Sequence, residues 1–159
     1  MPDSTPIYSD QFGPRKFKPH GRVTYEYSGK MLWANAIGPF NQELMAAVLE
    51  MARIAFPVMT AQGPWVHICT FHESALCSPE VLTDLGSALS EMALDGVAPQ
   101  AMAFVLPAAV EGSALMGPLY AKVFQGTGVP FAHFADRDAA CAWVESVFGA
   151  WQSPTDTRP

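Results

Sequence analysis

The sequence has few cysteines, little charge and no long hydrophobic run. Cys69, Cys77 and Cys141 are too few and too widely spaced for a disulfide framework, and none belongs to a CxxC pair. Nine Lys and Arg against 15 Asp and Glu give a net charge of −6, which argues against a surface for nucleic acid or anionic lipid. No apolar run approaches the ~20 residues of a membrane span, and residues 1–6 do not resemble a secretory signal. We therefore expect a cytoplasmic protein that binds neither nucleic acid nor membranes.

The residues that are present are those of one folded domain. Half of the 159 residues are hydrophobic, which is enough for a core, and the chain is short for two domains. Residues 1–20 contain four prolines and no helical or strand period, so we expect a flexible N-terminal arm there. We expect the domain to occupy residues 21–152 and a C-terminal tail to occupy residues 153–159.

Five segments are typical of β-strands. The alternation at 22–27, the Ser28–Gly29 turn and the run at 31–37 predict a β-hairpin. The runs at 65–71 and 101–106 are almost wholly apolar and too short for helices, so they predict strands buried on both faces. A fifth, shorter strand is expected at 131–134.

Four helices are expected between and after these strands. Asn41 can cap the first helix, which Pro57 should end, and Ser78 can cap a second that stops at Asp95. A third fits residues 113–124, and a fourth begins at Asp136 or Asp138 and ends near residue 151. The order predicts a single α/β domain with a mixed, mostly parallel five-stranded sheet, opened by a β-hairpin and covered by about four helices on both faces.

Three local pieces carry a resemblance to a known family: WVHICT at 65–70, LCSPEV at 76–81 and FADRDAACAWV at 134–144. With the order of elements, they resemble the STAS-type fold of anti-sigma-factor antagonists over about residues 21–151. The resemblance implies a regulatory interaction domain with a phosphoacceptor hydroxyl at the start of the second helix. Ser78 stands at that place, where the sequence Cys77–Ser78–Pro79–Glu80 replaces the family's Asp-Ser-Ser/Thr-Gly box.

Ser78 therefore has two interpretations, a phosphoacceptor or a helix cap. A phosphate at a helix N-terminus would be stabilised by the dipole and the free N–H groups. The cap requires only the hydroxyl, and Pro79 and Glu80 are the residues that helix starts favour at the next two positions. Glu80 would also repel an added phosphate.

The loop after the third strand is the candidate catalytic site. His72, Glu73 and Cys77 lie there with Ser74 and Ser78, and α/β sheets place ligand sites at this edge. A small enzyme using His72, Glu73, Cys77 and Ser78 is therefore the alternative function. Neither a Gly-x-Ser-x-Gly elbow nor another catalytic signature accompanies these residues.

The same region contains the densest set of possible metal ligands. On a strand, His67 and Cys69 would point to one face, whereas His72 and Glu73 lie beyond the strand end. Convergence would need a sharp reversal of the chain, so we expect no metal site and no cofactor. A buried His67 with one hydrogen bond is the favoured interpretation.

Soft and aromatic side chains are abundant. Met residues are adaptable fillers, so a sheet packed with them can keep a groove for a small apolar molecule. Trp143 and Trp151 lie on the last helix, where residues 144, 147, 148 and 151 share a stripe that can cover the sheet and Trp143 flanks it. We expect Trp143 to lie in a homodimer surface. The leading hypothesis is a non-enzymatic STAS-like module that binds a protein partner or a small apolar ligand.

Overall fold

A computed structural model describes residues 5–13 and 20–148 of the chain. In this part, an α/β domain contains a six-stranded mixed sheet in the order β1-β2-β3-β4-β5-β6. The strands are β1 (Ile7–Tyr8), β2 (Arg22–Ser28), β3 (Met31–Ile37), β4 (Val66–His72), β5 (Met102–Val105) and β6 (Phe131–Phe134). The helices are α1 (Gln42–Thr60), α2 (Pro79–Leu94), α3 (Ser113–Gln125) and α4 (Arg137–Phe148), and η1 (Ser9–Gln11) is a short 3-10 turn.

The sheet has an antiparallel beginning and a parallel remainder. β1 and β2 pair antiparallel, as do β2 and β3, and β3 to β6 follow one another in parallel. Each parallel connection contains one helix, which is the arrangement that right-handed crossovers require. The expected α/β domain, its opening hairpin and its four helices are therefore confirmed.

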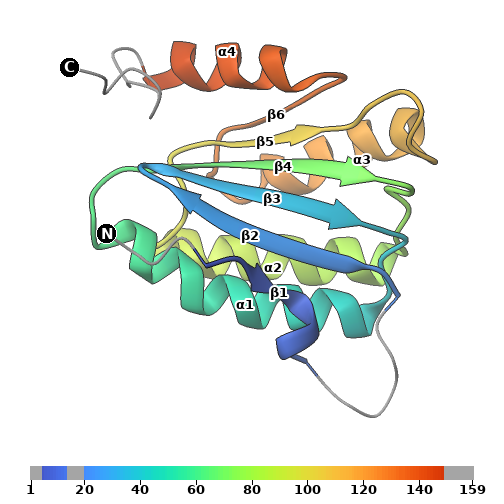
Figure 1. Cartoon of the computed structure of the whole chain (residues 1–159), viewed down its shortest axis with the longest axis horizontal. Helices are drawn as coiled ribbons and strands as arrows, with labels where there is room; N and C mark the ends of the chain where they lie inside the picture. The colour runs from blue at the N-terminus through green and yellow to red at the C-terminus, as the bar shows by residue number, and fades with distance from the viewer. Residues whose placement is uncertain (1–4, 14–19, 149–159) are drawn as a thin grey trace.

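The helices divide unequally between the two faces of the sheet. Figure 1 shows α1 and α2 beneath the sheet and α4 above it. The core on the first side also contains Met116, Tyr120 and Phe124 of α3, so three helices cover this inner face. On the opposite, outer face, α4 contacts β4, β5 and β6 through Ala140 and Val144. The prediction of helices on both faces is confirmed.

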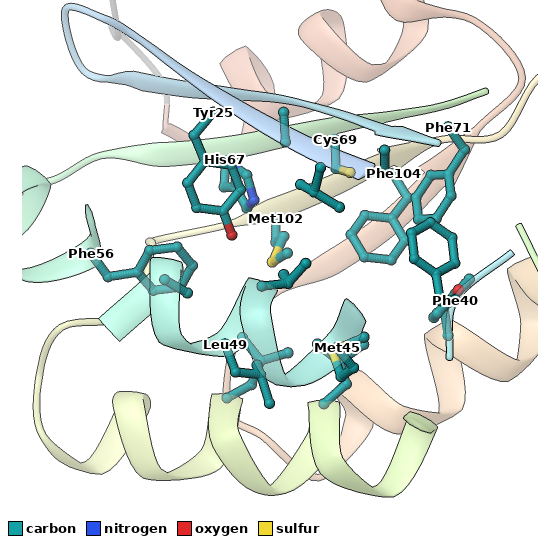
Figure 2. Close-up of a pocket in the computed structure, with 18 of the residues that line it drawn as sticks. Tyr25, Phe40, Met45, Leu49, Phe56, His67, Cys69, Phe71, Met102 and Phe104 are labelled. Atoms are coloured by element: carbon teal, nitrogen blue, oxygen red, sulfur yellow. The ribbon is translucent and has the colours of Figure 1, made fainter. Parts of the chain in front are cut away.

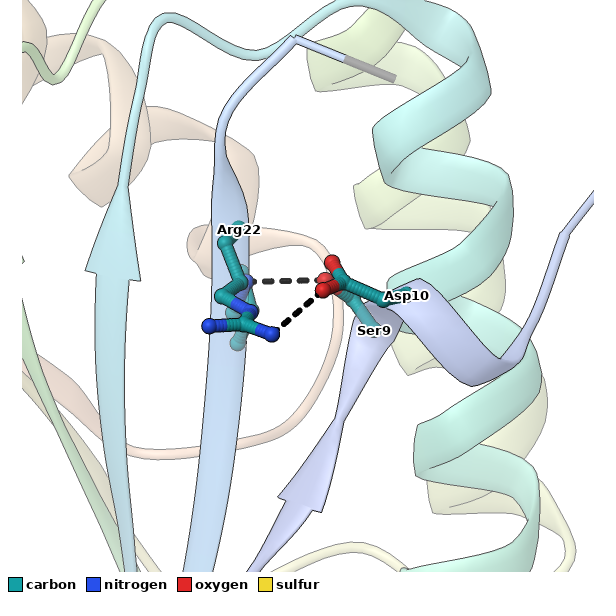
Figure 3. A network of polar contacts seen from close by, with 4 residues as sticks. Ser9, Asp10 and Arg22 are labelled. Carbon is teal, nitrogen blue, oxygen red and sulfur yellow. Dashed lines mark hydrogen bonds and ion pairs between the residues drawn. The ribbon is translucent and has the colours of Figure 1, made fainter. Parts of the chain in front are cut away.

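The sixth strand was missed because β1 has only two residues and carries no readable period. β1 pairs with β2 at Ile7 opposite Tyr25 and Tyr8 opposite Thr24, within the segment that was expected to be a flexible arm. Figure 3 shows how η1 holds this edge. The Val23 N–H donates to the Ser9 hydroxyl at 2.9 Å, and Arg22 forms an ion pair with Asp10.

The end predicted for the first helix was wrong. α1 continues through Pro57 to Thr60. A proline removes the hydrogen bond to the carbonyl four residues earlier, here that of Arg53, but both residues face solvent, where water can replace the bond. Met59, in the last turn of α1, is buried in the core and holds this turn in place.

None of the described helices is long and apolar enough to cross a bilayer.

Candidate functional site

A small apolar cavity lies against the inner face of the sheet. Its volume is about 70 Å³, and it lies between β2 to β5 on one side and α1 and α2 on the other. Figure 2 shows the aromatic rings of Tyr25, Phe56, Phe71 and Phe104 around this space, with Leu49 of α1 below it. Charged side chains are absent from its lining.

Small residues in the middle of the sheet create the space. Ala34 of β3 lies between Tyr25 of β2 and Cys69 of β4 in the strand register. Ala36 lies in the same way between Val23 and Phe71. Because alanine side chains end at Cβ, the larger neighbours on both sides stand above β3 and leave a hollow over it. On the facing helix α1, Ala52 lines the same cavity.

Methionines form part of the cavity wall. Met45 of α1, Met92 of α2 and Met102 of β5 all line it, and each is buried. Because methionine side chains are unbranched and change rotamer easily, this wall can adjust to a guest. The structure thus places soft side chains around a cavity, in the way that the methionine content suggested.

His67 is a deeply buried polar group of the cavity. Its side chain is 2% exposed, and its Nδ1 lies 2.8 Å from the Leu32 carbonyl oxygen on the neighbouring strand. Burial lowers the pKa of His67 to about 4, although the bond to Leu32 opposes the shift. The imidazole is therefore neutral at pH 7. The prediction of a buried His67 with one hydrogen bond is confirmed.

Tyr25 and Cys69 bring two more neutral polar groups to the cavity. Both are buried, and burial raises the pKa of Tyr25 well above its ordinary value, with a smaller effect of Cys69. Burial also raises the pKa of Cys69 to about 12, so the thiol is protonated. Across the described chain, no hydrogen bond engages the Tyr25 hydroxyl or the Cys69 thiol.

The expected catalytic loop is held by several unrelated contacts. The exposed His72 lies on the outer face, where its Nε2 is 2.9 Å from Oδ1 of Asn35. Glu73 has a left-handed backbone with φ of 62°, and its carbonyl accepts from the Glu111 N–H. Ser74 is buried, and its hydroxyl donates to the Glu111 carboxylate at 3.3 Å.

Cys77 and Ser78 lie farther along the same loop. The Tyr120 hydroxyl donates to the Ala75 carbonyl at 3.0 Å and lies 3.6 Å from Cys77 Sγ. Burial raises the pKa of Cys77, which disfavours the thiolate that a nucleophile needs. Ser78 is the N-cap of α2, and its hydroxyl accepts from the Val81 N–H at 3.4 Å.

These loop residues do not form one hydrogen-bonded set. Among residues 5–13 and 20–148, no hydrogen bond joins any two of His72, Glu73, Cys77 and Ser78. Within the same ranges, no group of three or more His, Cys, Asp or Glu has a metal-binding arrangement. His67 and Cys69 share the inner face, as expected, and His72 is on the other.

The last helix packs differently from the predicted stripe. Val144 is fully buried against the sheet, whereas Val147, expected on the same stripe, is 43% exposed. Trp143 is half-buried and lies 5.9 Å from the Phe134 ring, measured between centroids. Trp151 lies outside the described residues. The homodimer surface around Trp143 stays a prediction.

Sequence reasoning missed Tyr25 as a site residue. The alternating pattern of residues 22–27 placed Tyr25 in a strand, but nothing in the local sequence relates Tyr25 to His67, which lies 42 positions later. Their proximity depends on the pairing of β2, β3 and β4, which brings the two rings edge to face with centroids 5.4 Å apart. Phe56 of α1, 5.8 Å from the His67 ring, was missed for the same reason.

Comparison of the chain with protein-family models, curated proteins and solved structures gave no significant match.

Proposed function

We propose that this protein is a small module that binds an apolar ligand between its sheet and helices α1 and α2. The observation that carries the proposal is the cavity over Ala34 and Ala36, which is enclosed by apolar and aromatic side chains. Ligand sites in proteins are typically concave and apolar, with a few polar groups that orient the ligand. The cavity has both features.

The energetics of core packing favour a guest in this cavity. Cavities in protein cores destabilise by ~24 cal/mol per Å³, so a volume of 70 Å³ would cost on the order of 2 kcal/mol if nothing filled it. A guest of matching size recovers part of that energy through dispersion contacts with the walls. For scale, an engineered cavity of ~150 Å³ lined by apolar residues takes up benzene or xenon.

A STAS-like relationship is the second part of the proposal. It is supported by the hairpin at the start of the sheet and by the Ser-containing turn at the start of α2. In such a module, a ligand that fills the core would change the packing of α1 and α2, and thereby the surface that these helices offer to a partner protein. Ser78 would be the residue modified if the module is regulated by phosphorylation.

Xenon tests the ligand-binding part directly. We expect the ¹²⁹Xe resonance to shift in a saturable manner with added protein, because a monatomic apolar guest needs no hydrogen bond. Ala52→Leu should abolish the saturable shift by filling the cavity from α1. Ala46→Leu is the matched control, since Ala46 is exposed on the same helix.

Two outcomes of the xenon experiment would contradict the proposal. Equal xenon binding by the wild type and Ala52→Leu would place the guest elsewhere and overturn the assignment of the cavity. No saturable shift with the wild-type protein would overturn the ligand-binding function itself.

A further inference from the structure

The cavity contains polar atoms that the protein itself does not satisfy. Tyr25 and His67 are 3% and 2% exposed, and both line the cavity. Figure 2 shows the Tyr25 hydroxyl directed away from the sheet toward α1, with the His67 ring beside it. Within the described chain, the Tyr25 hydroxyl and Nε2 of His67 have no hydrogen-bond partner. Buried polar groups without partners are rare, because each one costs the free energy of its lost hydration.

The hydrogen bond of His67 fixes what its free nitrogen can do. The Leu32 carbonyl can only accept, so Nδ1 of the neutral ring carries the proton. Nε2 is then unprotonated and is an acceptor. The Tyr25 hydroxyl can donate or accept, and the Cys69 thiol is a weak donor. The cavity therefore offers one strong acceptor and one strong donor on two rings whose centroids are 5.4 Å apart.

This arrangement matches a hydroxyl group. A ligand O–H can donate to Nε2 of His67 while its oxygen accepts from the Tyr25 hydroxyl. A carboxylate or an ammonium group would enter a space lined by no charged side chain and would lose its hydration without a counter-ion. The site thus excludes ions and favours a neutral molecule.

Water alone does not fit the whole cavity. One water molecule needs about 10–15 Å³ of such space and two to four polar partners. The volume of about 70 Å³ is several times larger, and the walls away from Tyr25, His67, Cys69 and Tyr120 are apolar. The Tyr120 hydroxyl already donates to the Ala75 carbonyl. A molecule with one hydroxyl group and a short apolar chain fits both the polar end of the cavity and its apolar remainder.

We propose that the ligand is a compact neutral molecule with a single hydroxyl group, which is bound between the Tyr25 hydroxyl and Nε2 of His67. This inference rests on the proposed ligand-binding function and names the class of ligand. The apolar part of the ligand lies toward Met45, Met92 and Met102, and the flexible side chains of these residues limit its size.

Four probes of similar size test the inference: 1-butanol, n-pentane, butyrate and butylammonium. Binding is followed by the methyl resonances of ¹³C-methyl methionine, because three methionines line the cavity. We expect saturable shifts with 1-butanol, weaker binding of n-pentane and no saturable binding of either ion. Because the hydroxyl adds a buried hydrogen bond that n-pentane cannot form, 1-butanol should bind several-fold more tightly than n-pentane.

Tyr25→Phe removes the hydroxyl and keeps the ring. It should weaken 1-butanol binding about fivefold and leave n-pentane binding unchanged. His67→Asn is the second variant, because its amide N–H can still donate to the Leu32 carbonyl while the acceptor at Nε2 is lost. Tyr27→Phe is the matched control, since Tyr27 is on the same strand and outside the cavity lining.

The outcomes separate this inference from the proposed function. Equal binding of 1-butanol and n-pentane, or unchanged 1-butanol binding by Tyr25→Phe, would overturn the hydroxyl site and leave an apolar cavity that binds xenon. Tighter binding of butyrate or butylammonium would overturn the neutral class of ligand. If no probe and no xenon binds, the cavity holds water at most, and both proposals fail.

Discussion

The two faces of the sheet are built from alternate residues of the same strands, yet they have different coverings. Three helices seal the inner face, where His67, Cys69 and Phe71 of β4 point. On the outer face, α4 covers β4 to β6, and the part over β2 and β3 exposes Glu26 and Asn35. A strand can thus carry polar side chains to both faces, but only those on the inner face lose their water.

The hollows on the two faces differ accordingly. A space of about 260 Å³ on the outer face is lined by Glu26, Asn35 and Thr70, with the Arg137 guanidinium 3.9 Å from the Trp33 ring centroid. It is larger than the inner cavity, but Glu26 and Asn35 in its lining are exposed to solvent. Volume alone therefore does not distinguish the two hollows, whereas the burial of unsatisfied polar atoms does.

The largest expected difference between the faces is in stability. Phe104→Ala should lower the free energy of unfolding by about 3–5 kcal/mol, because this buried ring contacts Phe71, Tyr120 and Phe131. Trp33→Ala on the outer face should cost about 1–2 kcal/mol, mainly the stacking with Arg137 and partial burial. Urea titrations of both variants measure the difference. Equal losses would contradict the unequal sealing of the two faces.

The second-largest effect is a pH dependence of the free energy of unfolding, which comes from His67. Its pKa is about 4 in the folded protein and about 6.5 when unfolded, so between these values the unfolded chain binds more protons. Stability is therefore retained above pH 6.5 and is lost as the pH falls from 6.5 toward 4. At 1.36 kcal/mol per pKa unit, the loss is about 3 kcal/mol.

His67→Asn checks the origin of this loss. The variant keeps a donor for the Leu32 carbonyl but has no titrating group. Urea titrations from pH 7 to pH 4 should show a smaller loss of stability for the variant than for the wild type. If the two proteins lose stability in parallel, His67 is not the group responsible.

Helix caps on both faces should contribute about equally to the free energy of unfolding, because a cap acts only on the first turn of its helix. Ser78→Ala at the start of α2 should cost about 1 kcal/mol, and Ser78→Gly only a few tenths. Asp136→Ala should cost about 1 kcal/mol or slightly more, since the Asp136 carboxylate accepts from the Ala139 N–H at 2.8 Å at the start of α4. Thermal unfolding of the three variants measures these effects. Negligible losses for both Ser78 variants would show that the hydroxyl does not stabilise α2.

The smallest effect is expected at the exposed edge of the sheet. Asp10→Asn should change stability by less than about 0.5 kcal/mol, because both partners of the Arg22–Asp10 pair are about half exposed. Ser9→Ala should cost more, about 1 kcal/mol, since Ser9 is 1% exposed and accepts from the Val23 N–H. Parallel urea titrations of the two variants compare them. A larger loss from Asp10→Asn would reverse the expected order of surface and buried contacts.

Most of the fold could be predicted because the elements are marked by local chemistry. Asn41 and Ser78 cap α1 and α2 as expected, and the strands β2 and β3 begin at Arg22 and Met31 as their patterns indicate. The errors occurred where tertiary contacts override local preference. Helix α1 continues through Pro57 because the Arg53 carbonyl, which loses its helical partner there, faces water. Strand β1 forms because β2 presents a free edge.

The candidate site was less predictable than the fold. The burial of His67 with one hydrogen bond followed from its place in an apolar run, and that prediction is confirmed. The loop residues His72, Glu73, Cys77 and Ser78 drew attention because they are neighbours in sequence, yet each has a different partner in space. Tyr25 has no sequence neighbour of chemical interest, and only strand pairing brings it to His67.

The sequence by itself determined the α/β class, the order of its elements and the starts of its helices, because periodicity and capping act within a few residues. The tertiary structure alone decided that alanines of β3 and α1 face one another, and that the polar atoms of Tyr25 and His67 enter the resulting space. The physical reason is that a cavity and its unsatisfied polar groups are properties of packing between distant segments. Local sequence patterns do not encode the volume that such segments leave between them.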